Sequence, residues 1–186
     1  MVIVPRLSLA LATLLSLAPL AAGAFSLESA EIKRNATIAA AQVYNGFGCT
    51  GGNISPSLAW KDPPAGVRSY AITVYDPDAP TGSGWWHWVV YNLPATTTSL
   101  PAGAGDKSGA KLPAGAVHGR TDFGTPGFGG PCPPQGDKPH RYIFTVHALK
   151  IDKLDVPADA TAALIGFMIN ANRLGNVSFT GMYGRK

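Results

Sequence analysis

Two short apolar runs dominate the centre of the chain and predict its core. Residues 70–75 (YAITVY) and 88–93 (WVVYNL) are rich in Val, Ile, Tyr and Trp, and turn residues bound them. Runs of this length and composition are typical of buried strands rather than of helices. Asp76 ends the first run, Asp78 follows it, and His87 precedes the second. If the two strands pair antiparallel, a carboxylate and an imidazole meet at one edge of the sheet.

A third strand brings a second histidine to the same edge. Residues 140–149 alternate between apolar and polar positions and are rich in aromatic side chains, a pattern that predicts a strand. His140 opens this strand just after a proline-rich segment, residues 130–134. With a single return strand before it, this strand runs in the same direction as residues 88–93. His140 then joins the other polar side chains at that edge.

The remaining segments predict short strands and long loops. Residues 25–42 carry scattered apolar positions suited to strands, and residues 58–60 form a short run of the kind found at a sheet edge. Residues 45–53 are rich in glycine, which permits positive φ angles and close backbone approach. No phosphate-loop lysine and no helical pattern accompany them, so we interpret this segment as a structural loop rather than as a phosphate cradle. Residues 94–115 predict a surface loop with at most one short strand.

One helix is predicted near the C-terminus. Residues 159–174 carry an i, i+3, i+4 repeat of apolar side chains, with Asp159 or Thr161 as the N-cap and Gly175 at the end. We expect this apolar stripe to contact the core rather than a partner or a membrane. Residues 176–183 predict a final strand. The stripe consists of Ala163, Leu164, Phe167, Met168 and Ala171.

The N-terminus has the pattern of a secretory signal peptide. Arg6 precedes an almost continuous apolar run over residues 7–20, and small residues follow at 22–24. A membrane anchor is the alternative, but the run is shorter than the roughly 20 apolar residues that a span needs, and Pro19 interrupts it. We therefore expect cleavage after Ala24, a periplasmic or secreted protein, and no membrane span in the mature chain.

The length and composition of the mature chain favour one mainly β domain. Residues 25–186 number about 162, enough for a single domain with its own core. The whole sequence contains 22 glycines and 16 prolines, and helical periodicity is scarce. The formal charge of +4 is spread along the chain, and no Lys/Arg cluster alternates with aromatic residues. We therefore expect a mildly basic soluble surface and no nucleic-acid partner.

Two cysteines, Cys49 and Cys132, belong to the mature chain. In an oxidising compartment such a pair usually forms a disulfide, and we expect one here. It would close a loop of about 84 residues and stabilise the fold by about 4–5 kcal/mol in the chain-entropy model. Two free thiols or a transient redox pair are the alternatives. The spacing is not Cys-x-x-Cys, which argues against a thioredoxin-like role.

The polar residues at the predicted sheet edge suit a small anionic ligand. His87 and His140 can be charged near neutral pH or can donate from a neutral ring, and both properties suit a phosphate or a carboxylate. Asp76 would orient a histidine or pair with an ammonium group. A phosphate that carries a cationic head group would therefore offer its negative charge to the histidines and its positive charge to Asp76. Trp85, Tyr142 and the proline-rich segment would form the walls.

Other interpretations of these residues stay open. A buried His–Asp pair often serves only to satisfy its own hydrogen bonds, and Asp78 before a turn commonly bonds its own backbone. Two histidines and one aspartate match a metal-binding facial triad, but the chain has no local His-x-His or Glu-x-x-His spacing, so we predict no metal and no cofactor. A hydrolase is the least favoured interpretation, because there is no Gly-x-Ser-x-Gly motif and a disulfide would leave no free thiol. His118 and His147 are not assigned to the site.

Four motifs in the chain are similar to those of a known family. They are DPDAP at residues 76–80, WWHWVV at 85–90, GPCPP at 130–134 and HRY at 140–142. In order and spacing they resemble the phosphatidylethanolamine-binding proteins, and in particular their bacterial Raf-kinase-inhibitor-like branch. The resemblance extends from the glycine-rich loop near Asn45 to the final strand. It implies two antiparallel sheets packed as a sandwich, one or two short helices including a C-terminal one, and a small anion pocket.

The resemblance also implies the residues of that pocket and their use. Members bind phosphate or phospholipid head groups there without an established catalytic activity, and several inhibit kinases or proteases through their surfaces. An interaction module that inhibits a protease or a kinase is therefore the alternative function, and members of the bacterial branch can form homodimers. Trp86 stands where some relatives carry a further histidine and is not counted as a ligand. The implied ligand-binding residues are Asp76, Asp78, Trp85, His87, Pro133, Pro134, His140 and Tyr142.

Overall fold

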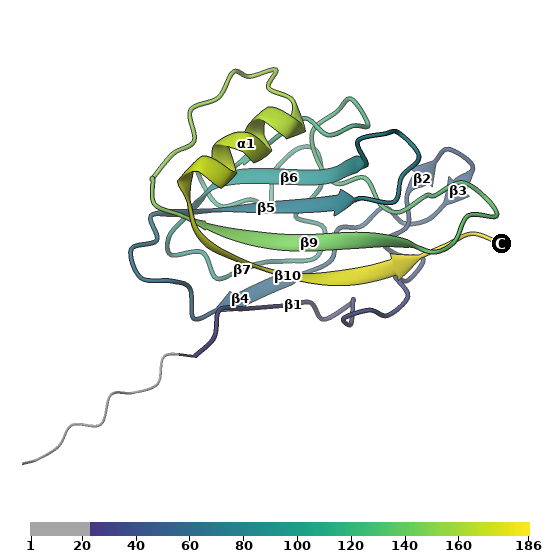
Figure 1. The fold of residues 1–186 in the computed structure, drawn as a ribbon, viewed down its shortest axis with the longest axis horizontal. Helices are drawn as coiled ribbons and strands as arrows, with labels where there is room; N and C mark the ends of the chain where they lie inside the picture. Colours follow the sequence, from purple (N-terminus) through teal and green to yellow (C-terminus); the bar gives the residue numbers. More distant parts are fainter. Residues whose placement is uncertain (1–22) are drawn as a thin grey trace, which may run out of the picture.

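The computed structural model describes residues 23–186 as two β-sheets, a small hairpin and one helix (Figure 1). The predicted signal peptide, residues 1–24, lies outside the described residues except for its last two. Within residues 23–186, no helix is both long and apolar enough to cross a bilayer.

The larger sheet consists of β5 (Ser69–Asp76), β6 (Trp85–Pro94), β8 (Val117–His118), β9 (His140–Leu149) and β10 (Arg173–Tyr183). Their order across the sheet is β10-β9-β5-β6-β8, and every neighbouring pair is antiparallel. The three apolar runs of the sequence are β5, β6 and β9, as predicted. Their residues are buried almost without interruption, because both faces of these strands are covered.

A smaller antiparallel sheet packs on the first. It consists of β1 (Ser26–Glu28), β4 (Leu58–Lys61) and β7 (Ser99–Leu100), in the order β1-β4-β7. The prediction that residues 58–60 lie at a sheet edge is wrong, because β1 and β7 pair with the two sides of β4. Of the strands expected within residues 25–42, the described chain forms β1 alone, and the remainder is turns and irregular backbone. A bridge between Thr37 and Met182 holds this segment to β10.

Alternation along the central strands divides the core into two layers. Tyr70, Ile72 and Val74 of β5 pack toward the smaller sheet, where Trp60 of β4 meets them. Ala71, on the opposite face, packs with the helix α1 (Ala162–Asn172). The fold is therefore a sandwich of two sheets with a helix on the outer face of the larger one (Figure 1), and it confirms the predicted mainly β class.

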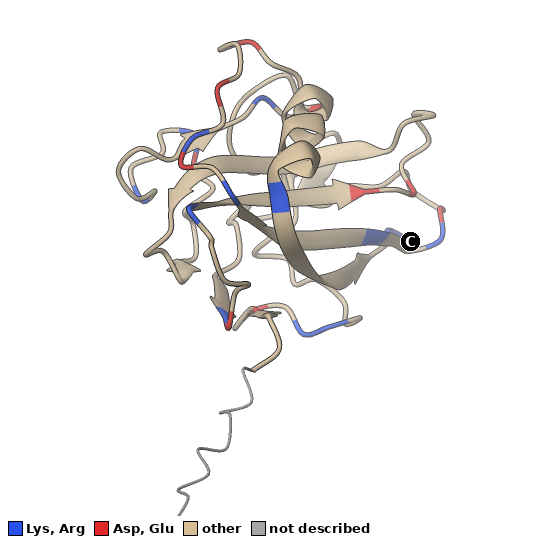
Figure 2. Ribbon diagram, turned by 60° about the vertical axis from the view of Figure 1, so that its left-hand side comes forward, with Lys and Arg blue, Asp and Glu red and all other residues tan. Residues whose placement is uncertain are grey.

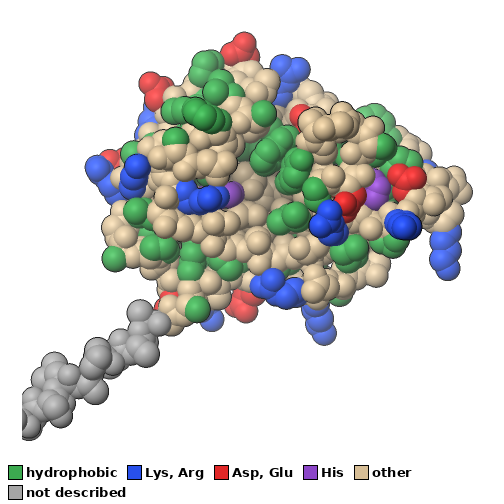
Figure 3. All heavy atoms as spheres, viewed as in Figure 1, with side chains coloured by type: hydrophobic (Ala, Val, Ile, Leu, Met, Phe, Trp, Pro, Cys, Tyr) green, Lys and Arg blue, Asp and Glu red, His purple; other side chains and the backbone are tan. Residues whose placement is uncertain are grey.

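Helix α1 forms where it is predicted but buries a different stripe. Thr161 caps it by accepting a hydrogen bond from the Leu164 backbone, and the chain enters β10 at Arg173, before Gly175. Most of the predicted stripe faces outward, with Leu164 40% exposed and Phe167 68% exposed, whereas Met168 packs partly against the core as expected. Figure 3 shows apolar side chains at the surface over this helix. The residues that are buried against the sheet are Ala162, Ile165 and Ile169.

Strand directions bring several polar strand ends together. β5 is antiparallel to both β6 and β9, so β6 and β9 run the same way although β5 separates them. Asp76 at the end of β5 is the register partner of Trp85 at the start of β6, and His140 starts β9 at the same edge. The return strand that this arrangement requires is β8, which pairs with β6. Figure 2 shows charged residues in loops and at strand ends rather than along the middle of the large sheet.

Candidate functional site

A cavity of about 140 Å³ opens at this edge of the large sheet. It is formed by the ends of β5, β6 and β9, the loop that joins β5 to β6, and the proline-rich segment. Seven of the eight side chains expected from the sequence line it. They are Asp76, Trp85, His87, Pro133, Pro134, His140 and Tyr142.

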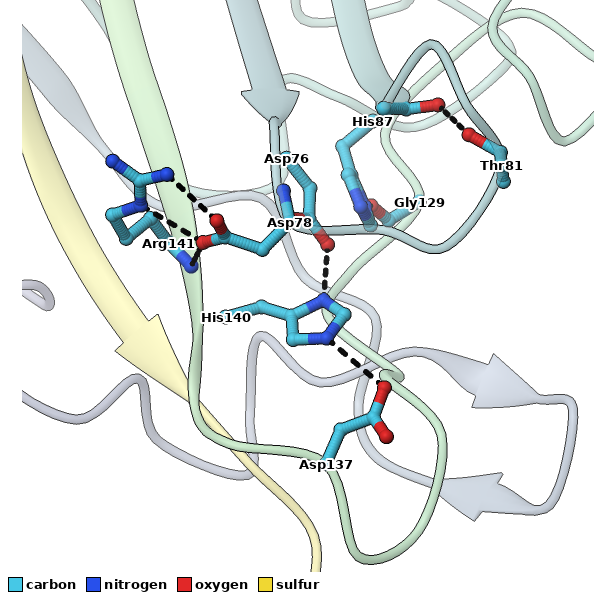
Figure 4. A network of polar contacts seen from close by, with 9 residues as sticks. Asp76, Asp78, Thr81, His87, Gly129, Asp137, His140 and Arg141 are labelled. Atoms are coloured by element: carbon cyan, nitrogen blue, oxygen red, sulfur yellow. Dashed lines mark hydrogen bonds and ion pairs between the residues drawn. The ribbon is translucent and has the colours of Figure 1, made fainter.

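A buried aspartate and a buried histidine form the centre of the cavity (Figure 4). His140 Nδ1 donates to Asp76 Oδ2 at 2.8 Å. The other carboxylate oxygen of Asp76 accepts a hydrogen bond of 2.8 Å from the backbone N–H of Asp78. The Asp76 carboxylate is therefore fixed from two sides, and its burial strengthens both hydrogen bonds.

A second carboxylate approaches the same histidine from the surface. Asp137 Oδ2 lies 3.4 Å from His140 Nε2, and the Asp137 side chain is 42% exposed. This distance exceeds the roughly 2.7–3.2 Å of a well-formed N–H···O hydrogen bond, so the contact is loose. Both ring nitrogens of His140 thus face carboxylate oxygens, one tightly and one loosely. Sequence reasoning missed Asp137, although it precedes His140 by only three residues.

His87 presents an uncharged ring to the cavity. Its Nδ1 donates to the backbone oxygen of Gly129 at 2.6 Å, which fixes the tautomer. Burial lowers the pKa of His87 to about 4, from an ordinary value of 6.5. Near neutral pH, Nε2 therefore carries a lone pair, and no described residue donates to it. His87 is a hydrogen-bond acceptor in the cavity rather than a cation.

Tyr142 forms a buried part of the cavity wall. Its ring packs edge-on against His87, with centroids 5.0 Å apart. Its hydroxyl is buried and has no hydrogen-bond partner among the described residues. Burial, together with the charge of Asp76, raises the pKa of Tyr142. The hydroxyl stays protonated and can donate to a bound ligand.

Asp78 is the expected site residue that does not line the cavity. Its carboxylate accepts two hydrogen bonds from the Arg141 guanidinium, at 2.6 and 2.9 Å, and one from the Arg141 backbone N–H at 2.9 Å (Figure 4). The bonds from Arg141 lower the pKa of Asp78 to about 2. Asp78 therefore ties the loop after β5 to the start of β9, which positions Asp76 and His140.

A disulfide joins two loops at the mouth of the cavity. Cys49 pairs with Cys132, with Cα atoms 6.1 Å apart and a sequence separation of 83. The segment around Cys49, expected to be a loop, is a hairpin of two short strands, β2 (Asn45–Gly46) and β3 (Cys49–Thr50). The disulfide holds this hairpin against the proline-rich segment, so Phe47 at its tip reaches the cavity.

Two phenylalanines that were not expected complete the wall. Phe47 has a positive φ of 51° and is 69% exposed. The Phe123 ring stacks on it with centroids 5.9 Å apart, and meets Trp85 edge-on at 5.5 Å. Pairing of Cys49 with Cys132 is the signal that could have located Phe47, since it brings the hairpin to the proline wall. No comparable signal in the sequence marks Phe123.

The other two histidines lie outside the cavity. His118 accepts a hydrogen bond of 3.2 Å from Trp88 Nε1. His147 is buried on the sheet face that carries α1, with Nε2 2.9 Å from Thr73 Oγ1. Within residues 23–186, no group of three or more His, Cys, Asp and Glu side chains is arranged to hold a metal ion.

The fold and the cavity define a β-sandwich protein with a partly enclosed site at a sheet edge, in which a buried His–Asp pair lies among aromatic and proline side chains. The family model of the phosphatidylethanolamine-binding protein matches residues 28–184, and the chain belongs to this family. The resemblance carried by the four sequence motifs is thereby confirmed.

Several known proteins are similar to this chain. YbcL of Escherichia coli strain K12 is 56% identical over 162 residues, which cover 87% of this chain and 88% of YbcL. YbhB of the same strain is 55% identical over 141 residues, covering 76% and 88% of the two chains. The crystal structure of YbcL, described as a new member of the mammalian family, matches with a TM-score of 0.86 at 55% identity, over 88% of this chain and 100% of that one. LppC of Mycobacterium tuberculosis, named as a lipoprotein, is 34% identical over 137 residues, or 74% of this chain and 63% of LppC.

Proposed function

We propose that the chain is an exported, non-enzymatic binding protein whose cavity takes a small phosphate-bearing group, such as a phospholipid head group. The observation that supports this most is the convergence of seven expected side chains, from three strands and the proline-rich segment, on one cavity. The family to which the chain belongs is named for binding a phospholipid with such a head group.

The charged groups at the cavity favour a head group that carries both a positive and a negative charge over a ligand that is only an anion. Asp76 and Asp137 attract an ammonium group and repel an isolated phosphate. His140 can exchange its loose contact with Asp137 for a hydrogen bond to a phosphate oxygen. His87 Nε2 accepts from an ammonium N–H or a phosphate O–H. Phosphoethanolamine offers all of these groups, so we expect it to bind more tightly than inorganic phosphate.

The hydroxyl and sulfur groups around the cavity favour binding over covalent catalysis. Cys132 belongs to the disulfide. The Thr81 hydroxyl donates to the Gly84 backbone oxygen at 2.5 Å, and burial raises the pKa of Tyr142. In the described part of the chain neither hydroxyl donates to a cavity histidine, which is the contact that would activate it as a nucleophile.

The disulfide and the N-terminal pattern support an envelope or extracellular location. Oxidised cysteine pairs persist in the periplasm and outside the cell, whereas the cytosol reduces them. The signal-peptide pattern of residues 1–24 gives a route for export. The name of LppC as a lipoprotein is compatible with the same compartment. We therefore propose the periplasm or the medium as the site of action.

Isothermal titration calorimetry of the mature chain tests the proposed ligand. Phosphoethanolamine should bind, and His87→Ala or His140→Ala should weaken binding by about tenfold or more, or about 1.4 kcal/mol. His118→Ala is the matched control, because His118 lies outside the cavity, and should leave the affinity within about twofold. Circular dichroism would verify that each variant is folded.

Two results would contradict the proposal. Unchanged affinity in both cavity variants would remove the assignment of the cavity as the ligand site. Turnover of a chromogenic phosphate ester by the wild-type chain, abolished by His87→Ala, would show that the protein is a hydrolase.

A further inference from the structure

A second and larger cavity lies beside the first. It has a volume of about 740 Å³ and is formed by three loops, within residues 52–55, 102–111 and 121–129. We call it the lysine groove, after Lys107 and Lys111, which line it. The first cavity, at about 140 Å³, is smaller than the roughly 300–1,000 Å³ of ordinary small-molecule sites, whereas the groove falls within that range.

Phe123 is the wall that the two cavities share. On one side its ring lies 5.4 Å from the His87 ring and 5.5 Å from Trp85, which line the first cavity. On the other side it lies 4.5 Å from Tyr44, which lines the groove. A side chain at Gly129 would overlap the Phe123 ring, so the ring lies directly on the backbone that also receives the His87 hydrogen bond. A ligand that extends past Phe123 therefore enters the groove.

Hydrogen bonds between the loops fix the floor of the groove. The Asn53 side chain donates to the Phe128 backbone oxygen at 3.1 Å and accepts from the Gly130 backbone N–H at 2.8 Å. The Ser55 hydroxyl oxygen accepts from the Gly105 backbone N–H at 2.8 Å. These bonds connect all three loops, so the groove exists before a ligand arrives, which lowers the entropic cost of binding.

The groove carries a charge opposite to that of the first cavity. Lys107 and Lys111 have no ion-pair partner within the described chain, and the Lys111 ammonium donates to the Ala102 backbone oxygen at 3.2 Å. The one carboxylate among the groove residues, Asp106, accepts from the Ser108 backbone N–H at 2.9 Å. The groove therefore attracts anions, whereas Asp76 in the first cavity attracts cations.

We propose that the lysine groove binds a second anionic group of the same ligand. The ligand is an elongated molecule with a phosphate-bearing group in the first cavity, a linker across Phe123, and a phosphate or carboxylate at Lys107 and Lys111. The inference rests on the proposed function of the first cavity and extends it to a two-part site. When one molecule carries both groups and its linker matches the distance between the two sites, binding of the first group holds the second close to its site. The affinity of the molecule then exceeds that of either group alone.

A series of linear alkanediol bisphosphates in which one phosphate carries an ethanolamine ester tests this, with the alkyl phosphoethanolamine of equal length as the monophosphate reference for each. Calorimetry on the mature chain should find a linker length at which the bisphosphate binds about tenfold more tightly than its monophosphate. The double variant Lys107→Ala/Lys111→Ala should abolish that advantage and leave phosphoethanolamine binding unchanged. High salt should reduce the advantage as well, because both lysines are solvent-accessible. The control is Lys150→Ala/Lys153→Ala, which removes two exposed lysines that line neither cavity.

The possible outcomes distinguish a failure of the groove proposal from a failure of the proposed function. If phosphoethanolamine binds but no bisphosphate gains an advantage, or the advantage survives in Lys107→Ala/Lys111→Ala, the groove proposal is wrong and the proposed function stands. If His87→Ala weakens phosphoethanolamine binding but leaves the affinity of the bisphosphate itself unchanged, the groove acts alone and the two-part site is wrong. If no phosphate compound binds at all, both proposals fail.

Discussion

His87 and His140 line the same cavity but have opposite chemical roles. His87 donates Nδ1–H to Gly129 and is kept neutral by burial, so it offers a lone pair. His140 donates from Nδ1 to Asp76, and its Nε2 faces the carboxylate of Asp137. The sequence identifies both histidines as site residues. It could not assign these roles, because the deciding partners, a loop carbonyl and a surface aspartate, are brought in by the fold.

The loose contact of Asp137 leads to a prediction about phosphate affinity. Asp137→Asn removes a negative charge 3.4 Å from His140 Nε2, so inorganic phosphate should bind about threefold to tenfold more tightly, in line with about 1 kcal/mol for a partly exposed charge pair. Phosphoethanolamine should gain less, because its ammonium group loses a partner. Calorimetry measures both. Asp155→Asn is the control for net charge, and an equal gain there would mean that Asp137 acts only through long-range charge.

At the scale of elements, the sequence predicted the strands of the larger sheet better than it predicted the face of the helix. Strands β5 and β9 are recognisable because their apolar runs are short and end in turn residues. Helix α1 has the sequence AALIGFMINAN and is apolar on several sides, so periodicity does not select one stripe. Packing on the outer face of the sheet determines which stripe is buried, because Ile165 and Ile169 pack against Ala71, Val89 and Leu149.

The buried stripe and the exposed stripe of α1 should differ sharply in their contribution to the stability of the fold. Ile165→Ala removes a fully buried side chain and should lower the free energy of unfolding by about 2–4 kcal/mol. Phe167→Ala removes an exposed side chain and should change it by less than about 0.5 kcal/mol. Urea denaturation followed by fluorescence measures both. Equal losses would show that the outward stripe is packed in solution, against another surface.

At the scale of the whole molecule, some features that bring distant segments together can be recognised in the sequence and others cannot. The motifs that carry Asp76, His87 and His140 are local, and their convergence follows from strand direction, so it could be predicted. Of the two phenylalanines in the wall, Phe47 lies at the tip of the hairpin and Phe123 in a loop without a regular pattern. The position of Phe47 depends on the disulfide, which the two cysteines predict, whereas that of Phe123 depends on loop packing, which composition and periodicity do not encode.

Buried neutral histidines should make the fold sensitive to acid. Burial lowers the pKa of His147 to about 3, and its Nδ1 has no partner in the described chain. The unfolded chain therefore binds this proton from about pH 6.5 downward, while the folded chain resists it until about pH 3. Stability should fall over that window by up to about 1.4 kcal/mol per pH unit for each such histidine, and His87 adds to the effect down to about pH 4.

Urea titrations at pH 7, 6 and 5 test the contribution of His147. In His147→Gln the loss of stability between pH 7 and pH 5 should be smaller than in the wild type, because one of the protons taken up on unfolding is gone. Parallel curves for the two proteins would mean that His147 does not titrate on unfolding as its burial implies.

The disulfide should affect both stability and the cavity. In Cys49→Ser/Cys132→Ser the free energy of unfolding should fall by up to about 4–5 kcal/mol, because the bond closes a loop with a sequence separation of 83. Affinity for phosphoethanolamine should fall too, since Phe47 is no longer held at the cavity. Wild-type protein treated with dithiothreitol should behave like the variant. Full affinity without the disulfide would show that noncovalent contacts suffice to place the hairpin.

If the chain is exported and binds the ligand that we propose, the disulfide also determines when a newly made chain becomes able to capture it. Before oxidation, the hairpin that carries Phe47 is joined to the proline wall by noncovalent contacts alone. A chain still in the reducing cytoplasm would then have sheets without a finished site, and the abundant phosphorylated metabolites there would not occupy it. Export would deliver an empty protein, and oxidation in the next compartment would make it competent to bind.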